Sequence, residues 1–417
     1  MTMPAPAPST PLRSPRWTLR LGAVALGLAL AACGPASDTE APAGDVAGTP
    51  VPMAHATTFS VTDLGEGVRV VDMRASVSSW GGAADGPEQQ ARLALVPLAV
   101  EVPALTGPLA GATVVRTPVE RVAVNYTPFE AMLSVLGVAD RLVAVGGTTS
   151  YDDAVYARVA SGELPQIGYG WHIPPAIDVL ATTEADVLLM ALADLGHAEA
   201  IPRIEAMGIP VVPMFLDAEP HYLGRVDYVR LVGMLTDREA EADSFVTMVT
   251  AEVDRLTALA ASQPTRSLMW AWYSGGDRWG AAVRNAEARL LRDANGRLAL
   301  EQPDDPRLDA RMEVGTERIL ADAADVACWV QDSHGEPYRN EAVLQRLRAW
   351  REGCVYAATG QTKPRRNAYD FYEMGAIRPD YLLGDLVKML HPEVRPEPFR
   401  YLVPAGPEAA ALLPAAP

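Results

Sequence analysis

RVAVNYTPFEAMLSVLG, residues 121–137, predicts a short β-strand followed at once by a helix. The helix is expected from Pro128 to Leu136, because four large apolar residues recur there at helical spacing: Phe129, Met132, Leu133 and Leu136. Gly137 then ends it. The sequence LVAV at 142–145 predicts the next strand. Strand, helix and strand in this order indicate neighbouring parallel strands, the repeating unit of an α/β fold.

The same alternation continues on both sides of a long helical stretch. The first block has further helices expected at 176–181 and 198–207, and strands at 186–190 and 209–212. The long stretch, 221–261, has a break at Thr236–Asp237, and its second half carries one apolar stripe: Val249, Val253, Leu256 and Ala260. The second block has a strand at 268–272 and helices at 286–294, 316–323, 341–349 and 377–390. We therefore expect an α/β fold with two lobes, each a parallel sheet flanked by helices, joined by one long helix.

The N-terminal part has a different character. Short strands are expected at 68–71, 93–96 and 113–116, which form a β extension ahead of the first lobe. A preceding stretch rich in Pro, Ala, Gly, Ser and Thr cannot bury enough apolar surface to fold, so we expect a flexible tether. The predicted segments are a signal peptide (1–32), the tether (33–56), the β extension (57–117), the N-terminal lobe (118–220), the connecting helix (221–262), the C-terminal lobe (263–400) and a tail (401–417).

The first 33 residues resemble a bacterial lipoprotein signal. Three arginines precede an apolar run from Leu21 to Ala32, and the small residues Ala31 and Ala32 stand directly before Cys33. The resemblance implies that Cys33 is lipidated and becomes the mature N-terminus. The protein would then act in the periplasm or on the outer face of the cell membrane, anchored by the lipid. The alternative, a short membrane helix with an incidental cysteine, is disfavoured because the run is short for a span.

Charge excludes one class of partner. The formal net charge is −17, and such an acidic surface repels nucleic acid and anionic lipid headgroups. The six histidines do not cluster, so a site for free zinc or manganese is not expected. There is no Gly-x-Ser-x-Gly motif and no phosphate-binding loop, so we do not expect an enzyme.

Two cysteines remain besides Cys33. Cys328 and Cys354 each lie in a predicted strand, with a predicted helix between them. Neighbouring parallel strands could bring the two sulfur atoms within bonding distance, which in an oxidising compartment favours a disulfide. The alternative is a pair of buried thiols.

The layout resembles the substrate-binding proteins of bacterial ABC importers, in the family that delivers iron complexes and vitamin B12. Five stretches carry the resemblance, and together they cover most of 121–393: 121–145 with Glu130 in its helix, 177–187, 231–242, 315–326 and 372–393. The resemblance implies two lobes on one rigid helix and no catalysis. It also implies a monomer without a cofactor, which takes a small-molecule iron complex to a permease dimer with its ATPase subunits.

In this family each lobe presents an acidic residue that docks onto an arginine of the permease. The matching positions here are Asp178 and Glu317, at the starts of predicted helices. Two separated carboxylates can steer and align the lobes on a two-fold partner. The alternative is that both acids only favour their helix N-termini.

The ligand is expected between the lobes, at the carboxyl ends of the strands. Aromatic rings offer flat faces to large ligands, and arginines pair with the negative charge of a ferric chelate. The candidates are Tyr126, Tyr151, Tyr169, Trp171, His172, Trp272, Tyr273, Trp279, Arg284, Arg365, Arg366, Tyr369 and Tyr372. Trp272 could equally belong to the core, His172 could be an ordinary loop histidine, and Arg365–Arg366 could be a solvated basic run.

The predicted function is therefore capture of an iron complex, a ferric siderophore, for an ABC importer. Cobalamin or haem capture by the same fold is the nearest alternative, and a histidine such as His172 would favour haem. A lipoprotein scaffold or sensor that does not transport is the third reading.

Overall fold

The stretch 121–145 forms the strand, helix and strand expected of it. The computed structural model describes residues 48–76, 87–170, 173–192, 195–283, 286–300, 311–331, 338 and 340–407, and Cys33 lies outside them. β6 (Val122–Val124), α1 (Thr127–Val135) and β7 (Leu142–Ala144) follow one another, and Pro128 lies in the first turn of α1. Proline suits this position because its missing N–H would have no partner inside the helix.

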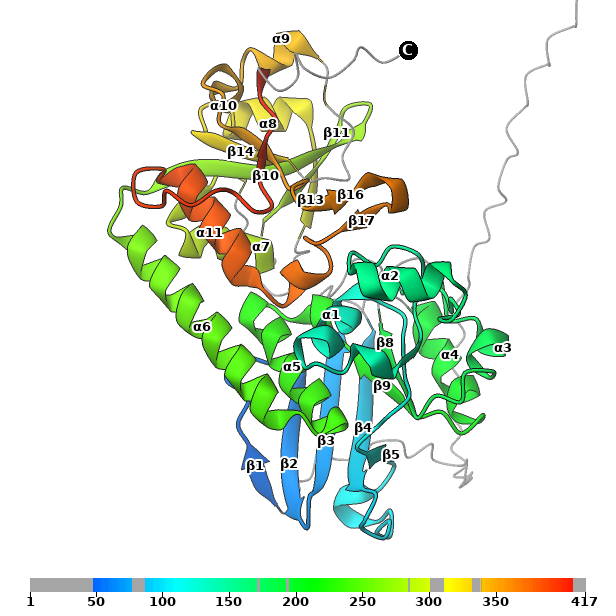
Figure 1. Ribbon diagram of the computed structural model, residues 1–417. Helices are drawn as coiled ribbons and strands as arrows, with labels where there is room; N and C mark the ends of the chain where they lie inside the picture. The colour runs from blue at the N-terminus through cyan, green and yellow to red at the C-terminus, as the bar shows by residue number, and fades with distance from the viewer. Residues whose placement is uncertain are drawn as a thin grey trace, which may run out of the picture. The chain divides into compact units, whose positions relative to one another are not determined.

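The N-terminal lobe is built on a four-stranded parallel sheet (Figure 1). Its order is β7-β6-β8-β9, with β8 at Val187–Ala191 and β9 at Val211–Met214. The helices α2 (Asp153–Ala160), α3 (Ile177–Leu180) and α4 (Leu195–Glu205) connect the strands. Because the strands are parallel, their carboxyl ends meet at one edge of the sheet, which is where a ligand site is expected.

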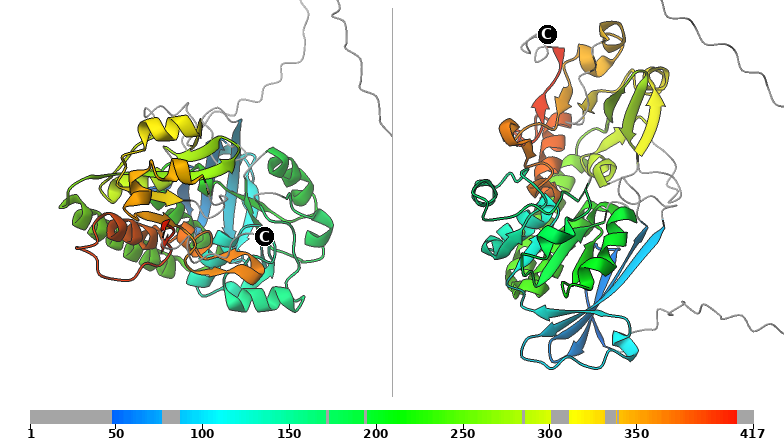
Figure 2. Two further views of the ribbon diagram at one scale, coloured as in Figure 1. Left: turned by 90° about the horizontal axis from the view of Figure 1, so that it is seen from above. Right: turned by 90° about the vertical axis from the view of Figure 1, so that its right-hand side faces the viewer.

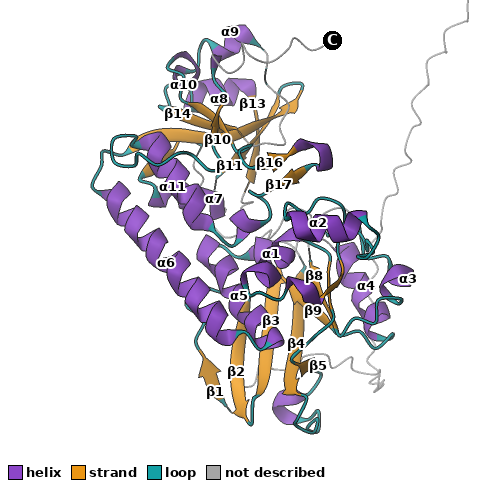
Figure 3. Ribbon diagram, in the orientation of Figure 1, coloured by secondary structure: helices purple, strands orange, loops and turns teal. Residues whose placement is uncertain are grey.

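The connection between the lobes is a pair of helices and not one long helix. α5 (Tyr222–Thr236) ends at Asp237, whose left-handed φ of 57° turns the chain, and α6 (Glu239–Ala261) follows. α5 packs in the N-terminal lobe, whereas α6 runs diagonally to the C-terminal helix α11 (Pro379–Leu390), as Figure 3 shows. The predicted apolar stripe of α6 is confirmed, since Val249, Val253, Leu256 and Ala260 are all buried.

The sheet of the C-terminal lobe contains the expected parallel strands together with antiparallel ones. β10 (Arg266–Gly275) pairs in parallel with β12 (Gly296–Leu298) and β14 (Cys328–Gln331), and β14 pairs in parallel with β15 (Val355–Ala357). On the other side β11 (Arg278–Ala282) and β13 (Arg311–Gly315) are antiparallel. The reason is a tight hairpin at Gly275–Gly276, whose positive φ angles return the chain directly along β10.

Short helices cover this sheet. They are α7 (Ala286–Asp293), α8 (Thr316–Asp322), α9 (Glu341–Leu344) and α10 (Arg348–Arg351), so the helix expected at 341–349 is split in two. β18 (Val403–Pro404) pairs with β15, and Tyr401 and Leu402 are fully buried. The predicted tail therefore begins later than residue 401, because Asp385 accepts the backbone N–H groups of Arg400, Tyr401 and Leu402 at 2.6–3.1 Å.

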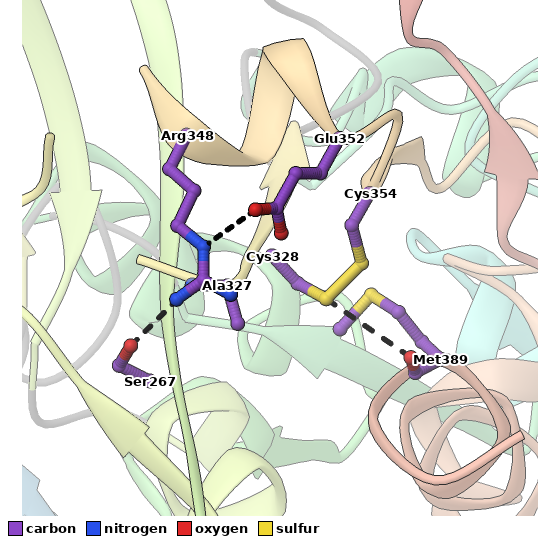
Figure 4. Close-up of a disulfide and its surroundings, with 7 residues drawn as sticks. All are labelled: Ser267, Ala327, Cys328, Arg348, Glu352, Cys354 and Met389. Atoms are coloured by element: carbon purple, nitrogen blue, oxygen red, sulfur yellow. Dashed lines mark hydrogen bonds and ion pairs between the residues drawn. A yellow bond between two sulfur atoms is a disulfide. The ribbon is translucent and has the colours of Figure 1, made fainter. Parts of the chain in front are cut away.

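Cys328 and Cys354 are joined by a disulfide with a Cα–Cα distance of 4.7 Å. Figure 4 shows the bond between β14 and the start of β15, beside α10 and close to Met389 of α11. Its neighbour Ala327 donates its N–H to Ser267 Oγ of β10, and Arg348 donates to Glu352 at 2.9 Å. The disulfide thus links two adjacent parallel strands, the arrangement that makes a bridge between them possible.

The N-terminal extension is a five-stranded sheet whose strands run side by side below the N-terminal lobe in Figure 2. Its strands, in the order of the sheet, are β1 (Thr49–Val51), β2 (Phe59–Gly65), β3 (Val68–Ser76), β4 (Glu88–Pro97) and β5 (Thr113–Thr117). One face of the sheet shares a single apolar core with the N-terminal lobe, α6 and α11. The extension is therefore part of the main body.

The tether prediction is wrong for residues 49–56. Thr49–Val51 pairs with β2, and the N–H groups of His55 and Ala56 donate to Asp227 Oδ2 at 2.6 and 2.9 Å. Glu219 accepts further bonds from Thr57 and Thr58. Two buried carboxylates thereby fix a stretch that composition alone marks as flexible.

Candidate functional site

Aromatic and amide side chains gather where β6 and β8 end. Asn125 follows β6 and is fully buried, and its Oδ1 accepts the Ala191 N–H at the end of β8, at 2.7 Å. The rings of Tyr126 and Tyr169 meet edge to face with centroids 5.5 Å apart. Burial raises the pKa of the Tyr169 phenol above its usual value, so it remains protonated and polar. The predicted residues Tyr126 and Tyr169 are therefore neighbours at this edge.

A hairpin of the C-terminal lobe reaches across to the N-terminal lobe. We call residues 361–377 the interlobe arm; it contains β16 (Thr362–Lys363), β17 (Ala368–Tyr369) and a short 3-10 turn at Met374–Ala376. Figure 1 shows β16 and β17 next to α2. Sequence reasoning did not predict this contact, because two-residue strands leave no periodic pattern.

The arm is held by ionic and hydrogen bonds to the first turn of α2. Lys363 Nζ and Arg366 both donate to the Tyr151 carbonyl, at 2.8 and 2.7 Å. Both cations also pair with Asp153, at 2.7 and 2.6 Å, and they lower the pKa of that carboxyl. The Tyr151 hydroxyl donates to Gln361 at 3.0 Å. Tyr151 and Arg366 were predicted as ligand contacts. In this structure Tyr151 of the N-terminal lobe bonds to the arm, and Arg366 of the arm bonds to the N-terminal lobe.

Two acidic side chains interact electrostatically where the arm contacts α1. Glu373 of the arm accepts the N–H groups of Tyr151 and Asp152 at 2.5 and 3.2 Å. Glu130 of α1 is 1% exposed, and Glu373 is 4% exposed. Burial raises the pKa of Glu130 well above its usual value, and the charge of Glu373 raises it further. Burial also raises the pKa of Glu373, to about 7.

A second contact between the lobes joins α5 to α7. Arg225 of α5 pairs with Glu287 of α7 at 3.3 Å, and the Tyr222 hydroxyl donates to Asp293 at 2.5 Å. These residues were not among the predicted ones, because helical periodicity identifies a buried face but not its partner. The two lobes are therefore linked between α5 and α7 and again at the arm.

The aromatic candidates of the C-terminal lobe divide into two groups. Tyr369 and Tyr372 lie in the arm with ring centroids 5.9 Å apart, and Arg365 is exposed there. Trp272 is half-buried, and its ring lies over Gly280, where a Cβ would come within 2.2 Å of it. Tyr273 is half-buried against Trp279, at 5.7 Å between ring centroids.

The expectation for Trp279 is corrected. Its side chain is fully buried in the core of the C-terminal lobe and donates to Thr316 Oγ1 at 3.0 Å. The β10–β11 register places it opposite Tyr273 on the core side of the sheet. The remaining candidates Trp171, His172 and Arg284 lie outside the described residues.

The two predicted docking acids are exposed. Asp178 lies in the first turn of α3 and Glu317 in the first turn of α8, so each lobe carries one. Among the described residues, no group of three or more His, Cys, Asp or Glu side chains could hold a metal ion. No helix in the described part of the chain is long and apolar enough to cross a bilayer. A cavity of about 220 Å³ lies elsewhere, between β4 and β9.

Comparison with known families identifies the fold. The model of the periplasmic binding protein family matches residues 122–361, more than half of the chain. The chain belongs to this family. Members of the family bind solutes outside the cytoplasm for ABC transporters, and the resemblance drawn from the sequence is confirmed. No curated protein matches the chain in sequence.

Solved structures of periplasmic binding proteins share the fold at low identity. A periplasmic heme-binding protein from Pseudomonas aeruginosa is 17% identical, with 68% of this chain and 97% of that chain covered and a TM-score of 0.50. A possible iron-binding, periplasmic solute-binding protein from Staphylococcus epidermidis is 14% identical and has a TM-score of 0.51. The match covers 66% of this chain and 100% of that chain. The siderophore-binding protein BauB, in complex with acinetobactin and ferric iron, is 13% identical and has a TM-score of 0.51. The match covers 66% of this chain and 94% of that chain. At these identities the comparison supports the two-lobed fold alone.

Proposed function

We propose that this periplasmic binding protein captures a ferric siderophore between its lobes and delivers it to an ABC importer. The observation that carries the proposal is the family match across both lobes together with the α6 connection between them. Solved proteins of the same fold include binders of heme and of a ferric siderophore. Cys33 would anchor the protein to the membrane through a lipid, and the permease dimer with its ATPase subunits would be the partner.

The side chains at the cleft support an anionic, ring-bearing ligand. Tyr126 and Tyr169 offer ring faces and edges from the N-terminal lobe, and Tyr369 and Tyr372 offer them from the arm. Arg365 is exposed in the same arm, in a protein that is otherwise strongly acidic. A guanidinium pairs with carboxylate, hydroxamate or catecholate oxygens of a chelate whose net charge is negative.

Tryptophan fluorescence of the protein without its lipid, titrated with a panel of ligands, tests the proposal. The panel contains ferric hydroxamates, ferric catecholates, ferric citrate, haem and cobalamin, each with its metal-free form. Seven of the eight tryptophans of the chain follow Cys33, so we expect saturable quenching by one ferric chelate and none by its iron-free form. If only haem or cobalamin saturates the quenching, that molecule is the ligand and the siderophore is not. If no member of the panel does so, the proposal is contradicted.

Delivery is tested by reversing the two docking charges. We expect Asp178→Lys with Glu317→Lys to reduce import at least tenfold while the affinity for the ligand stays the same, because both acids are exposed in first turns of helices. The matched control is Glu199→Lys with Glu341→Lys, two exposed acids of α4 and α9, of which Glu341 lies in the first turn of its helix. Equal import by the test and control variants would show that these acids do not dock.

A further inference from the structure

Two buried glutamates lie where the interlobe arm contacts α1. They have no part in the proposed permease docking or ligand capture. Glu130 comes from the N-terminal lobe and Glu373 from the arm of the C-terminal lobe, and both are almost completely buried. The carboxylate oxygens of Glu130 have no hydrogen-bond partner that satisfies distance and angle among the described residues. Two like charges in this environment repel strongly, because burial leaves little water to screen them.

Among the described residues, no cation forms an ion pair with Glu130 or Glu373. Within the part of the chain that the structure describes, Glu373 accepts hydrogen bonds from the N–H groups of Tyr151 and Asp152. The carboxylates of Asp152 and Asp370 add negative potential, and Asp370 is itself paired with Arg400 at 2.6 Å. Ser150 of the N-terminal lobe and the phenol of Tyr169 are the other groups that interact with the pair, and neither carries positive charge.

The basic residues of the arm are committed to other partners. Lys363 and Arg366 bind Asp153 and the Tyr151 carbonyl, and each lies over an aromatic ring, of Tyr151 and Tyr156 respectively. Neither forms an ion pair with Glu130 or Glu373 within the described chain. A proton is therefore the simplest means of relieving the repulsion.

We propose that the two lobes close with uptake of a proton, which Glu130 and Glu373 hold between them, so that the arm releases α2 as the pH rises. In the separated state both carboxyls meet water and ionise independently. In the contact seen here, at most one of them carries a charge. The proposal rests on the proposed function only in taking the cleft as the ligand site, and the test below needs no ligand.

The direction of the pH dependence follows from linkage. The ordinary pKa of a glutamate is near 4.5, and in the closed contact burial raises the pKa of Glu373 to about 7. Below about pH 4.5 both states hold the proton, so closure does not depend on pH. Between about 4.5 and 7 the closed state binds more protons than the open state, and the closed-to-open ratio falls by up to about tenfold per pH unit. Closure is therefore favoured at acidic pH.

The distance between the lobes measures this directly. Spin labels on Thr182→Cys and Glu341→Cys, both exposed and on different lobes, report the distance by pulsed electron resonance, with Cys33→Ser so that no third cysteine reacts. We expect the long-distance population to grow from pH 5 to pH 8. Glu130→Gln and Glu373→Gln each remove a titrating charge and should flatten this change at least threefold, whereas the exposed control Glu352→Gln should not.

Two further measurements keep the outcome decisive. Lys363→Met with Arg366→Met removes the arm contacts but keeps both acids, so we expect the long distance at every pH. In the unlabelled, unsubstituted protein, the N–H groups of Tyr151 and Asp152 should lose protection from hydrogen exchange between pH 5 and 8, beyond the intrinsic change in rate. A distance that is the same from pH 5 to 8, or a pH dependence that both glutamine variants retain, would overturn the proposal.

Discussion

Single buried carboxylates organise backbone that has no regular structure of its own. Glu219 accepts the N–H groups and the hydroxyls of both Thr57 and Thr58, at 2.6–3.0 Å. Gly224 makes room for it, since a Cβ there would lie 2.5 Å from Glu219 Oε2. Asp227 plays the same part for His55 and Ala56. Each carboxylate attaches the start of the β extension to α5 or to the turn before it.

The first prediction concerns Glu219. We expect Glu219→Ala to lower the free energy of unfolding by about 3 kcal/mol, because it leaves buried donors of Thr57 and Thr58 without an acceptor. Urea unfolding followed by circular dichroism measures the loss. Glu241→Ala is the control: Glu241 is exposed and pairs with Arg238 at 3.8 Å, so its loss costs less than about 1 kcal/mol. Equal effects of the two variants would mean that the bonds to Glu219 add nothing beyond a surface contact.

At the scale of residues, the sequence predicted which residues lie near the edge of the sheet better than it predicted which way their side chains point. Tyr126 and Tyr169 were placed at the carboxyl edge of the sheet because they follow predicted strands, and they lie there. Trp279 was not placed correctly, because only the register of β10 with β11 decides which face a residue of so short a strand occupies. The acidic pair of Glu130 and Glu373 was not predicted, since 243 positions of sequence separate its members.

At the scale of elements, the sequence predicted the long helices and the short helices α3 and α8, but it missed α2 and the strands β16 and β17. α1, α5, α6, α7 and α11 were expected within a few residues of their bounds, because each carries apolar positions at helical spacing. α2 was not expected, because only Val155 and Val159 are buried in it. β16 and β17 owe their position to contacts with α2, which no local pattern encodes.

The second prediction concerns the link between β14 and β15. We expect Cys328→Ala with Cys354→Ala to lower the free energy of unfolding by about 3 kcal/mol, because the disulfide closes a loop of 26 residues in the unfolded chain. Guanidinium unfolding of the oxidised protein, the reduced protein and the double variant measures it. Reduction should reproduce most of the effect of the substitution. If the three proteins unfold at one denaturant concentration, the disulfide does not stabilise the fold.

At the scale of the whole molecule, the two lobes predicted from the sequence are present, but the β extension is not independent of them. The predicted helical stretch between the lobes is divided into α5 and α6 at the break expected at Thr236–Asp237. The β extension, however, contributes Phe59, Val71, Met73, Leu93 and Val115 to the same apolar core as α1, α5 and β8. Composition cannot show this, since an alternating strand has one apolar face whether it covers a separate core or a shared one.

The third prediction follows from that shared core. A chain that begins at Val46 retains every described element and, as one compact unit, should unfold cooperatively at the same temperature as the protein from Cys33 onward. A chain that begins at residue 118 lacks the extension and exposes the apolar surface of the N-terminal lobe that β2–β5 cover. It should be insoluble, or bind a hydrophobic dye without a cooperative melting transition. Calorimetry and dye fluorescence of the two chains measure this. If the chain from residue 118 folds and melts cooperatively, the extension is a separate module and the lobe does not need it to fold.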